Sequence, residues 1–410
     1  MILVTELDLP VIDLDAAGRA GDGYHRLLAD LRRQGWLASS AVAFLVLDRE
    51  AGEFFLRSRA TAFPGRELAG LFGISSGPLR EHIDANILNQ QGERHRRLRA
   101  LVGPAFTPRA ADRWRPAMRG FLRQLWDATG WAGSCDFVAA VAKPYPSLTI
   151  AAVLGAPEQD APRLHQWSGL IQKQFDIRAL AGSVPEIEQA VTAARDYVEA
   201  LLRRRPAQPG DDLITSLLAA EHGGDRLTHG ECVDLVLNVI AGGVDTTQAQ
   251  LAHAMRLLAA HPRQWQLLAQ DPALAPRAVE EVLRAEPITP FTARICTEQV
   301  EHRGVTFPAG TIVAICAERA NREQDRGEEF DITAERDGRL LTFGAGAHFC
   351  LGANLARAEL EEALAFLAPR MAELAAGSPA RLGGVEGIYG IDELPLHWTP
   401  VAPASDLPAR

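Results

Sequence analysis

The chain has few cysteines, and their spacing offers no obvious way to pair them. Five cysteines are scattered over 410 residues, an odd number without close pairs, which argues against a disulfide framework and against a zinc site. We therefore expect a protein of a reducing compartment, the cytoplasm. The five are Cys135, Cys232, Cys296, Cys316 and Cys350.

Long apolar runs and an excess of positive charge are also missing. The N-terminal residues, Met-Ile-Leu-Val-Thr-Glu-Leu-Asp-Leu, match neither a signal peptide nor a membrane anchor, so we expect a soluble protein. Lys and Arg number 42 against 52 Asp and Glu, a net charge of −10, which argues against nucleic acid or acidic membranes as partners. With 47% hydrophobic and 23% charged residues, the composition is that of an ordinary globular protein.

One cysteine lies in a glycine-rich stretch directly ahead of a predicted helix. Residues 343–352 read Phe-Gly-Ala-Gly-Ala-His-Phe-Cys-Leu-Gly. The unpaired N–H groups and the dipole of the following helix favour a thiolate, so Cys350 is placed for ligation. Gly344 and Gly346 allow a tight turn, and Gly352 lets a flat bulky group approach the backbone. The alternative is a cysteine that packs as a small hydrophobic residue.

The longest apolar helix is predicted in the middle of the chain. Thr228 and Glu231 have the spacing of a capping box at its start, and residues 235–251 are apolar nearly all round, so this helix should pass through the centre of the molecule. Gly242 and Gly243 cost roughly 1 kcal/mol each in a helix interior. We therefore predict a locally opened helix with a function. The alternative is a notch for close helix packing.

A basic helix is predicted within residues 92–109. His95 and Arg99 lie four positions apart on one face, so both can reach a single anionic group. The alternative is a solvated basic helix, which is a common use of such charge runs.

These segments together resemble the cytochrome P450 family. The haem-binding loop of that family has the pattern found here at Phe343, Gly346, His348, Cys350 and Gly352. The resemblance extends roughly from residue 22 to residue 398 and implies a mainly α fold, a single triangular helix-rich domain with a small β-rich region. That domain is expected to span residues 1–410, with helix-rich parts at about 90–285 and 350–370 and β-rich parts at about 40–60, 290–320 and 380–400.

The resemblance also implies a role for each site residue. Cys350 is expected to bind the haem iron through its thiolate, and Asp245 and Thr246 to supply protons for dioxygen cleavage. Haem contacts are expected from His95, Arg99, Arg294 and His348, which bind propionates, and from Phe343, Gly346, Gly352, Gly242 and Gly243. Substrate contacts are expected from Val244, Thr289, Pro290, Phe291, Thr292, Ile388 and Tyr389.

Three further residues are assigned a structural role by the resemblance. Glu281 and Arg284 match the family's structural ion pair, whose third member is usually an arginine just before a phenylalanine. Glu329 precedes Phe330 here, so Arg336 is suggested as a substitute. Residues 176–185 separate two helical patterns and are a candidate lid over a substrate channel, or else a plain surface loop.

The implied activity is that of a haem-thiolate monooxygenase. It would use haem b and dioxygen, with electrons from a ferredoxin and its reductase docking near Arg94, Arg96, Arg97 and Arg109. Its substrate would be a hydrophobic small molecule, such as a terpenoid, steroid, fatty acid or polyketide of secondary metabolism, and the protein would be a monomer. The alternatives are a peroxygenase or oxidative-coupling enzyme, a haem-based sensor, and a serine hydrolase that rests only on Gly73-Ile-Ser75-Ser-Gly77.

Overall fold

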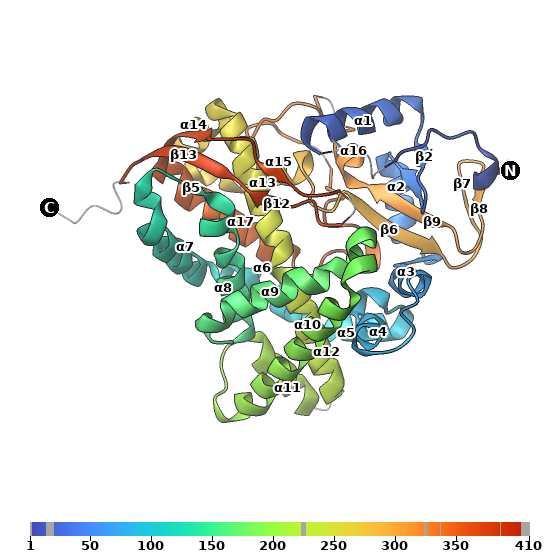
Figure 1. The fold of residues 1–410 in the computed structure, drawn as a ribbon, viewed down its shortest axis with the longest axis horizontal. Helices are drawn as coiled ribbons and strands as arrows, with labels where there is room; N and C mark the ends of the chain where they lie inside the picture. Colours follow the sequence, from blue (N-terminus) through green and yellow to red (C-terminus); the bar gives the residue numbers. More distant parts are fainter. Residues whose placement is uncertain are drawn as a thin grey trace.

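The computed structural model of the chain is mainly helical and describes residues 2–13, 20–222, 227–323, 326–336, 338–385 and 387–402. Its outline is roughly triangular, with α11 at the narrow end (Figure 1). The helices are α1 (Gly21–Gln34), α2 (Arg49–Arg57), α3 (Gly65–Leu71), α4 (Pro78–Ala85), α5 (Gly92–Val102), α6 (Pro108–Asp112), α7 (Arg115–Thr129), α8 (Pro144–Leu154), α9 (Ala161–Gln172), α10 (Ile177–Arg204), α11 (Leu213–His222), α12 (His229–Gly243), α13 (Asp245–Ala260), α14 (Pro262–Gln270), α15 (Ala275–Ala285), α16 (Ala317–Asn321) and α17 (Ala353–Leu367).

The strands form small sheets, and the largest lies at the N-terminal end of the molecule (Figure 1). Its order is β2-β3-β9-β6-β4, with β3 and β9 parallel and the other neighbours antiparallel. The other sheets are β1-β8-β7, β10-β13-β5 and β11-β12. The strands are β1 (Ile2–Leu3), β2 (Leu37–Ser39), β3 (Phe44–Val46), β4 (Thr61–Ala62), β5 (Ser134–Asp136), β6 (Phe291–Cys296), β7 (Val300–His302), β8 (Val305–Phe307), β9 (Ile312–Cys316), β10 (Met371–Ala376), β11 (Arg381–Leu382), β12 (Ile391–Glu393) and β13 (Pro395–Pro400).

The predicted central helix is present as α12 and α13. Thr228 accepts a hydrogen bond from the N–H of Glu231, whose carboxylate in turn accepts from the N–H of Thr228, so the capping box is confirmed. The two helices contact α8, α9, α14, α15 and α17 and run through the middle of Figure 1. The helix is interrupted at Val244, one residue after the glycine pair. The prediction of a locally opened helix is therefore correct.

The prediction that residues 176–185 form a lid or a surface loop is wrong, because nearly all of them belong to helix α10. Asp176 caps α10 by accepting hydrogen bonds from the N–H groups of Arg178 and Ala179, and the helix continues through Pro185. A proline removes one hydrogen bond but does not end a helix whose neighbours still pack. The connection between α9 and α10 is only residues 173–176. Within the expected β-rich part at 40–60, residues 49–57 form α2.

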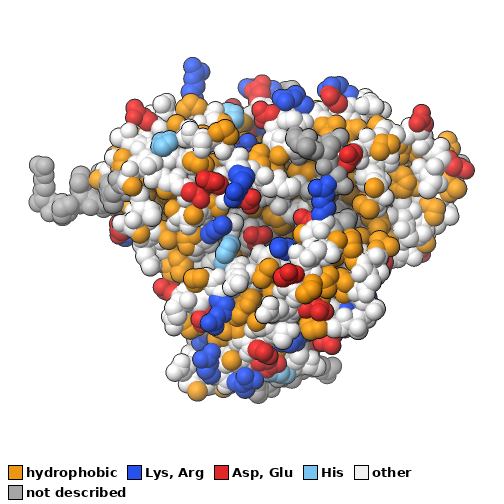
Figure 2. Space-filling model, in the orientation of Figure 1, with side chains coloured by type: hydrophobic (Ala, Val, Ile, Leu, Met, Phe, Trp, Pro, Cys, Tyr) orange, Lys and Arg blue, Asp and Glu red, His pale blue; other side chains and the backbone are white. Residues whose placement is uncertain are grey.

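Two further properties concern the charge of the surface and the hydrophobicity of the helices. Acidic and basic side chains are interspersed over the face drawn in Figure 2, with no large field of one sign. Among the residues that the structure describes, no helix is both long enough and apolar enough to cross a bilayer.

Candidate active site

The cysteine loop is folded tightly ahead of α17. The N–H of Gly344 donates to the carbonyl of Leu341 at 2.8 Å, and the N–H of Cys350 donates to the carbonyl of Phe343 at 2.9 Å. Gly344 has φ 70°, a left-handed conformation that favours glycine. Arg99 of α5 donates to the carbonyl of Phe349. The loop therefore holds the thiol between its own backbone and α5, three residues before α17.

The thiol of Cys350 is both accessible and closely surrounded by protein. Its side chain has accessible surface, yet protein surrounds it closely enough that burial is the largest influence on its pKa and raises it. The N–H groups of Gly352 and Ala353 and the charges of Arg99 and Arg357 act in the opposite direction. The thiol thus stays protonated in the protein alone, and a bound metal would displace that proton.

Four cationic or titratable side chains from three segments meet beside this loop. The rings of His95 on α5 and His348 lie 4.2 Å apart between centroids. Burial, followed by the charges of His95, Arg294 and Arg99, lowers the pKa of His348 to about 3. Arg294 of β6 is buried, and burial lowers its pKa to about 10. Its one hydrogen bond among the described residues goes to the carbonyl of Ala293, at 2.9 Å. An anion beside this cluster would offset the repulsion between its positive charges.

The four predicted cofactor glycines divide into two kinds. A Cβ at Gly242 or at Gly352 would meet no atom within 4 Å. At Gly243 it would lie 2.6 Å from Cδ1 of Ile150 on α8, and at Gly346 it would lie 2.9 Å from the carbonyl oxygen of Leu56 on α2. Gly243 and Gly346 therefore allow close packing against α8 and α2, and their assignment as cofactor contacts stays a prediction.

The predicted acid and alcohol follow the helix interruption. Thr246 donates its hydroxyl hydrogen to the carbonyl of Gly242 at 2.7 Å, so its side chain is held against the last turn of α12. Burial raises the pKa of Asp245 above its usual value, and the charge of Lys143 offsets only part of this rise. A carboxyl group with a raised pKa holds a proton closer to neutral pH, as a general acid must.

The predicted substrate residues point in different directions. Side chains alternate along a strand, so Thr292 shares a face of β6 with Arg294, whereas Phe291 faces the other side and packs 6.5 Å from the ring of Tyr24. Tyr389 is buried against α1, where its hydroxyl accepts from the N–H of Gly21 at 2.7 Å.

Phe291 and Tyr389 both pack against α1, and their assignment as substrate contacts stays a prediction. Ile388 and Thr289 are half-buried, while Pro290 and Val244 are buried. These four and Thr292 also remain candidates for substrate contact.

The proposed ion pair has its third member. Glu281 accepts from Arg284 at 2.7 and 2.8 Å and from Arg336 at 3.0 and 3.3 Å. Burial alone would raise the pKa of Glu281, but the bonds from both arginines and from the N–H of Asp331 lower it. Arg336 therefore lies where the resemblance required an arginine, although the residue before Phe330 is a glutamate.

Two residues near the site had no signal in the sequence. Lys143, just before α8, acts on Asp245 from about a hundred residues away in the chain. Arg357 lies one turn into α17 and places its guanidinium 4.6 Å from the centre of the Phe343 ring. Neither belongs to a recognisable local pattern, because only the packing of α8 against α13 and of α17 beneath the loop brings them there.

The serine of the hydrolase alternative is not part of this site. Ser75 is exposed and follows helix α3, not a strand, so the strand–turn–helix context of a nucleophile elbow is missing. Only the helix after it, α4, is present.

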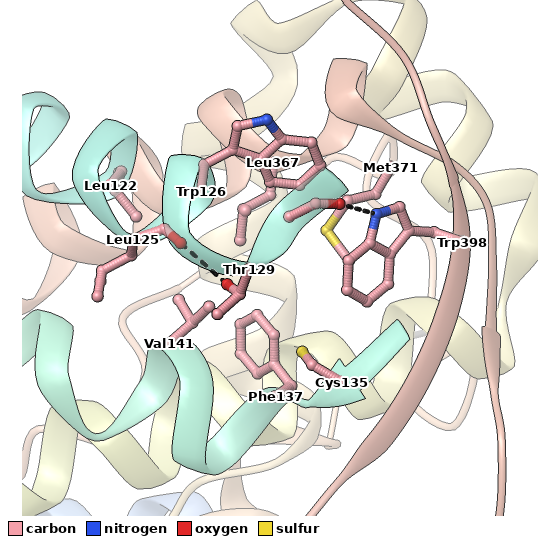
Figure 3. A pocket seen from close by; sticks show the side chains of 11 residues that line it. Leu122, Leu125, Trp126, Thr129, Cys135, Phe137, Val141, Leu367, Met371 and Trp398 are labelled. Atoms are coloured by element: carbon pink, nitrogen blue, oxygen red, sulfur yellow. Dashed lines mark hydrogen bonds between the residues drawn. The ribbon is translucent and has the colours of Figure 1, made fainter. Parts of the chain in front are cut away.

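A small cavity lies elsewhere, between α7, β5, β13 and the end of α17 (Figure 3). It measures about 10 Å³, and its lining includes Trp126, Phe137, Met371 and Trp398. The indole N–H of Trp398 donates to the carbonyl of Gly130 at 3.0 Å. This volume holds one water molecule at most, and the cavity shares no lining residue with the candidate site. It is a packing gap in the core.

The residues of the site fit a haem. A cysteine thiolate can bind the iron, Arg99 and Arg294 supply positive charge for the propionates, and the rings of His95 and His348 can donate hydrogen bonds to them. The open positions at Gly242 and Gly352 leave the backbone free beside a flat macrocycle. The combination of fold, thiol and cationic cluster is that of a haem-thiolate enzyme.

Comparisons with known proteins give the family. The cytochrome P450 family model matches residues 75–271 and 264–367. Luteothin monooxygenase of Streptomyces thioluteus is 35% identical over 401 residues, 95% of this chain and 96% of that protein. Mycinamicin IV hydroxylase/epoxidase of Micromonospora griseorubida is 36% identical over 326 residues, 78% of this chain and 81% of that protein.

Solved structures agree with the sequence comparison. The crystal structure of CalO2 superimposes with a TM-score of 0.88 at 30% identity and covers 96% of this chain and 100% of that chain. Epothilone D-bound cytochrome P450epoK gives a TM-score of 0.86 at 26% identity, covering 95% and 99%. The chain belongs to the cytochrome P450 family. It is a monooxygenase with the helix-rich fold that the resemblance implied.

Proposed function

We propose that this monooxygenase inserts one oxygen atom from dioxygen into a hydrophobic small molecule of secondary metabolism, by hydroxylation or epoxidation. Haem b is the proposed cofactor, and a ferredoxin with its reductase supplies the electrons. The observation that carries the proposal is the pair of Asp245 and Thr246 at the interruption of the central helix. A sensor or binding protein would have no use for this pair.

Each residue of the candidate site has a role in the proposed reaction. When bound, the haem would supply the oxidation itself. Cys350 would hold the iron through Sγ, Arg294 and Arg99 would neutralise the propionates, and His95 and His348 would donate hydrogen bonds to them.

Proton supply falls to Asp245 and Thr246. Burial raises the pKa of Asp245, which favours the protonated form of its carboxyl group. Thr246 gives its own hydrogen to the carbonyl of Gly242, so its oxygen lone pairs are left to accept a hydrogen bond. Thr246 therefore orients a proton donor and does not lose its own proton.

The proposed substrate class rests on the residues around the site and on named relatives. Val244 and Pro290 are apolar, and Thr289 and Thr292 offer hydroxyl groups. One relative is named as a hydroxylase/epoxidase of mycinamicin IV, and one similar structure binds epothilone D. A screen of hydrophobic compounds that follows the spin state of the haem iron by absorbance would identify ligands. A library without any spin-state change would count against a hydrophobic substrate.

The proposed ferredoxin would dock on the outer side of the cysteine loop. Arg94, Arg96 and Arg109 are exposed on α5 and α6, and Phe349 in the loop is 39% exposed. Arg97 pairs with Glu231, so it contributes less positive charge than the sequence suggested. Turnover with a ferredoxin and its reductase, compared with turnover on added peroxide, separates this proposal from a peroxygenase.

Thr246→Ala tests the proton supply. We expect this variant to keep its haem and its consumption of NADPH, while hydrogen peroxide replaces product. Thr246→Ser keeps the hydroxyl and should restore product formation. If Thr246→Ala produces as much product per NADPH as the wild type, the pair does not deliver protons.

A further inference from the structure

The interruption of the central helix is filled by a side chain from another helix. In a regular α-helix, the N–H of Asp245 would donate to the carbonyl of Ala241, but Val244 between them belongs to neither α12 nor α13. Ser168 of α9 donates its hydroxyl hydrogen to the carbonyl of Ala241 at 3.1 Å and accepts from the N–H of Asp245 at 3.3 Å. One hydroxyl thus replaces one hydrogen bond of the helix.

The hydroxyl of Ser168 is buried, and both of its hydrogen bonds go to the central helix. The residue is fully buried, at 0% exposure, on the face of α9 that packs against α12 and α13. A hydroxyl group has one hydrogen to donate, and here that hydrogen is used by Ala241 while the oxygen serves Asp245. A buried carbonyl and a buried N–H that would otherwise lack partners are both satisfied.

The hydroxyl of Thr246 is also bonded across the interruption. It donates to the carbonyl of Gly242, four residues earlier and on the other side of Val244, at 2.7 Å. If α12 and α13 joined, the backbone at residues 245 and 246 would turn, and both side chains would move. The orientation of the acid and the alcohol therefore depends on the separation of Ala241 from Asp245.

We infer that Ser168 is a positioning residue, which holds the central helix open and thereby orients Asp245 and Thr246 for proton delivery. This inference rests on the proposed function of that pair. Ser168 touches neither substrate nor cofactor in this role and acts only through the backbone of the central helix.

Ser168→Ala, prepared as the haem-loaded protein, is the direct test. We expect it to retain the thiolate-type carbon monoxide spectrum but to lower product per NADPH about threefold or more, the effect of losing one or two buried hydrogen bonds at the reacting pair. The solvent deuterium isotope effect on NADPH consumption should change as well. Turnover is measured with the compound from the hydrophobic screen that gives the largest change in the spin state of the haem iron.

A second readout needs no turnover. Hydrogen–deuterium exchange of the peptide that contains residues 241–247 should differ from the wild type in Ser168→Ala, because the Asp245 N–H loses its acceptor. Ser168→Thr keeps the hydroxyl and should restore both coupling and exchange. If Ser168→Ala does not fold, Ser168→Cys, with a weaker donor of similar size, is measured in its place.

The matched control is Ser147→Ala. Ser147 on α8 is equally buried, at 1% exposure, and its hydroxyl donates to the carbonyl of Lys143 within its own helix at 2.9 Å. Its loss should change neither readout. The inference is supported only if Ser168→Ala lowers coupling and alters exchange while Ser147→Ala does not, and any other combination overturns it. Thr246→Ala tests the proton pair independently, so failure of the inference is separable from failure of the proposed function.

Discussion

The adjacent glycines of the central helix should respond in opposite ways to the same substitution. In Gly242→Ala the new methyl group meets no protein atom within 4 Å, whereas in Gly243→Ala it lies 2.6 Å from Cδ1 and 3.1 Å from Cγ1 of Ile150. Alanine gains about 1 kcal/mol over glycine in a helix interior. Because both residues lie in the last turn of α12, this gain largely cancels when the two variants are compared.

The difference in stability between the two variants then comes from the steric cost at Ile150. That side chain is 1% exposed, so it cannot move into solvent, and overpacking of a core costs about 1–3 kcal/mol. Gly243→Ala should therefore be less stable than Gly242→Ala by that amount. Gly242→Ala should nevertheless lose activity, because its methyl group projects into the space beside the haem.

Thermal unfolding of the two haem-loaded variants, followed by circular dichroism, measures the difference. One kcal/mol corresponds to roughly 1–2 °C for a chain of this size, by extrapolation from smaller domains. Product formation is measured on the same preparations. Equal melting temperatures for the two variants, or full activity of Gly242→Ala, would refute the assignment of one glycine to the site and of the other to helix packing.

Two further predictions concern buried charges. His25 lies 3.1 Å from Glu286 and 3.0 Å from Glu318; burial would lower its pKa, but the two carboxylates raise it from 6.5 to about 9. Its contribution of up to about 3 kcal/mol is therefore complete below pH 6.5 and lost as the pH rises to 9. Urea unfolding across this range should show a steeper loss of stability in the wild type than in His25→Gln, and parallel curves would contradict the assignment. At the buried carboxylate of Glu281, Arg284→Ala should lower the free energy of unfolding by about 3–5 kcal/mol, because it removes the two hydrogen bonds from Arg284. Arg336→Ala, which leaves those bonds in place, should cost about 1–3 kcal/mol, and the reverse order in the same unfolding assay would exclude Arg336 as the secondary partner.

Local sequence patterns predicted the parts of the structure that local forces determine. The capping box at Thr228 and Glu231 needs only residues three apart, and two adjacent glycines indicated where the central helix is interrupted, although Ser168 of α9 also bonds across that interruption. The position of Cys350 before α17 is equally local, since the loop and the helix are continuous in the chain.

The features that the sequence did not reveal depend on distant residues. Gly243 packs against Ile150, nearly a hundred positions away, and no local pattern reveals that contact. Pro185 suggested a loop because proline usually ends helices, but Asp176 caps α10 and packing carries the helix through. Phe291 and Arg294 lie on opposite faces of β6, which becomes predictable only once the strand and its register are known.

The most direct test of the whole account is the thiolate bond from Cys350 to the haem iron. Cys350→Ala should be purified beside the wild type, reduced, and exposed to carbon monoxide, with haem content measured in both. We expect the wild type to give the absorbance spectrum of a thiolate-bound haem and the variant to lose it. An unchanged spectrum in Cys350→Ala would contradict the central claim, because another residue would then hold the iron.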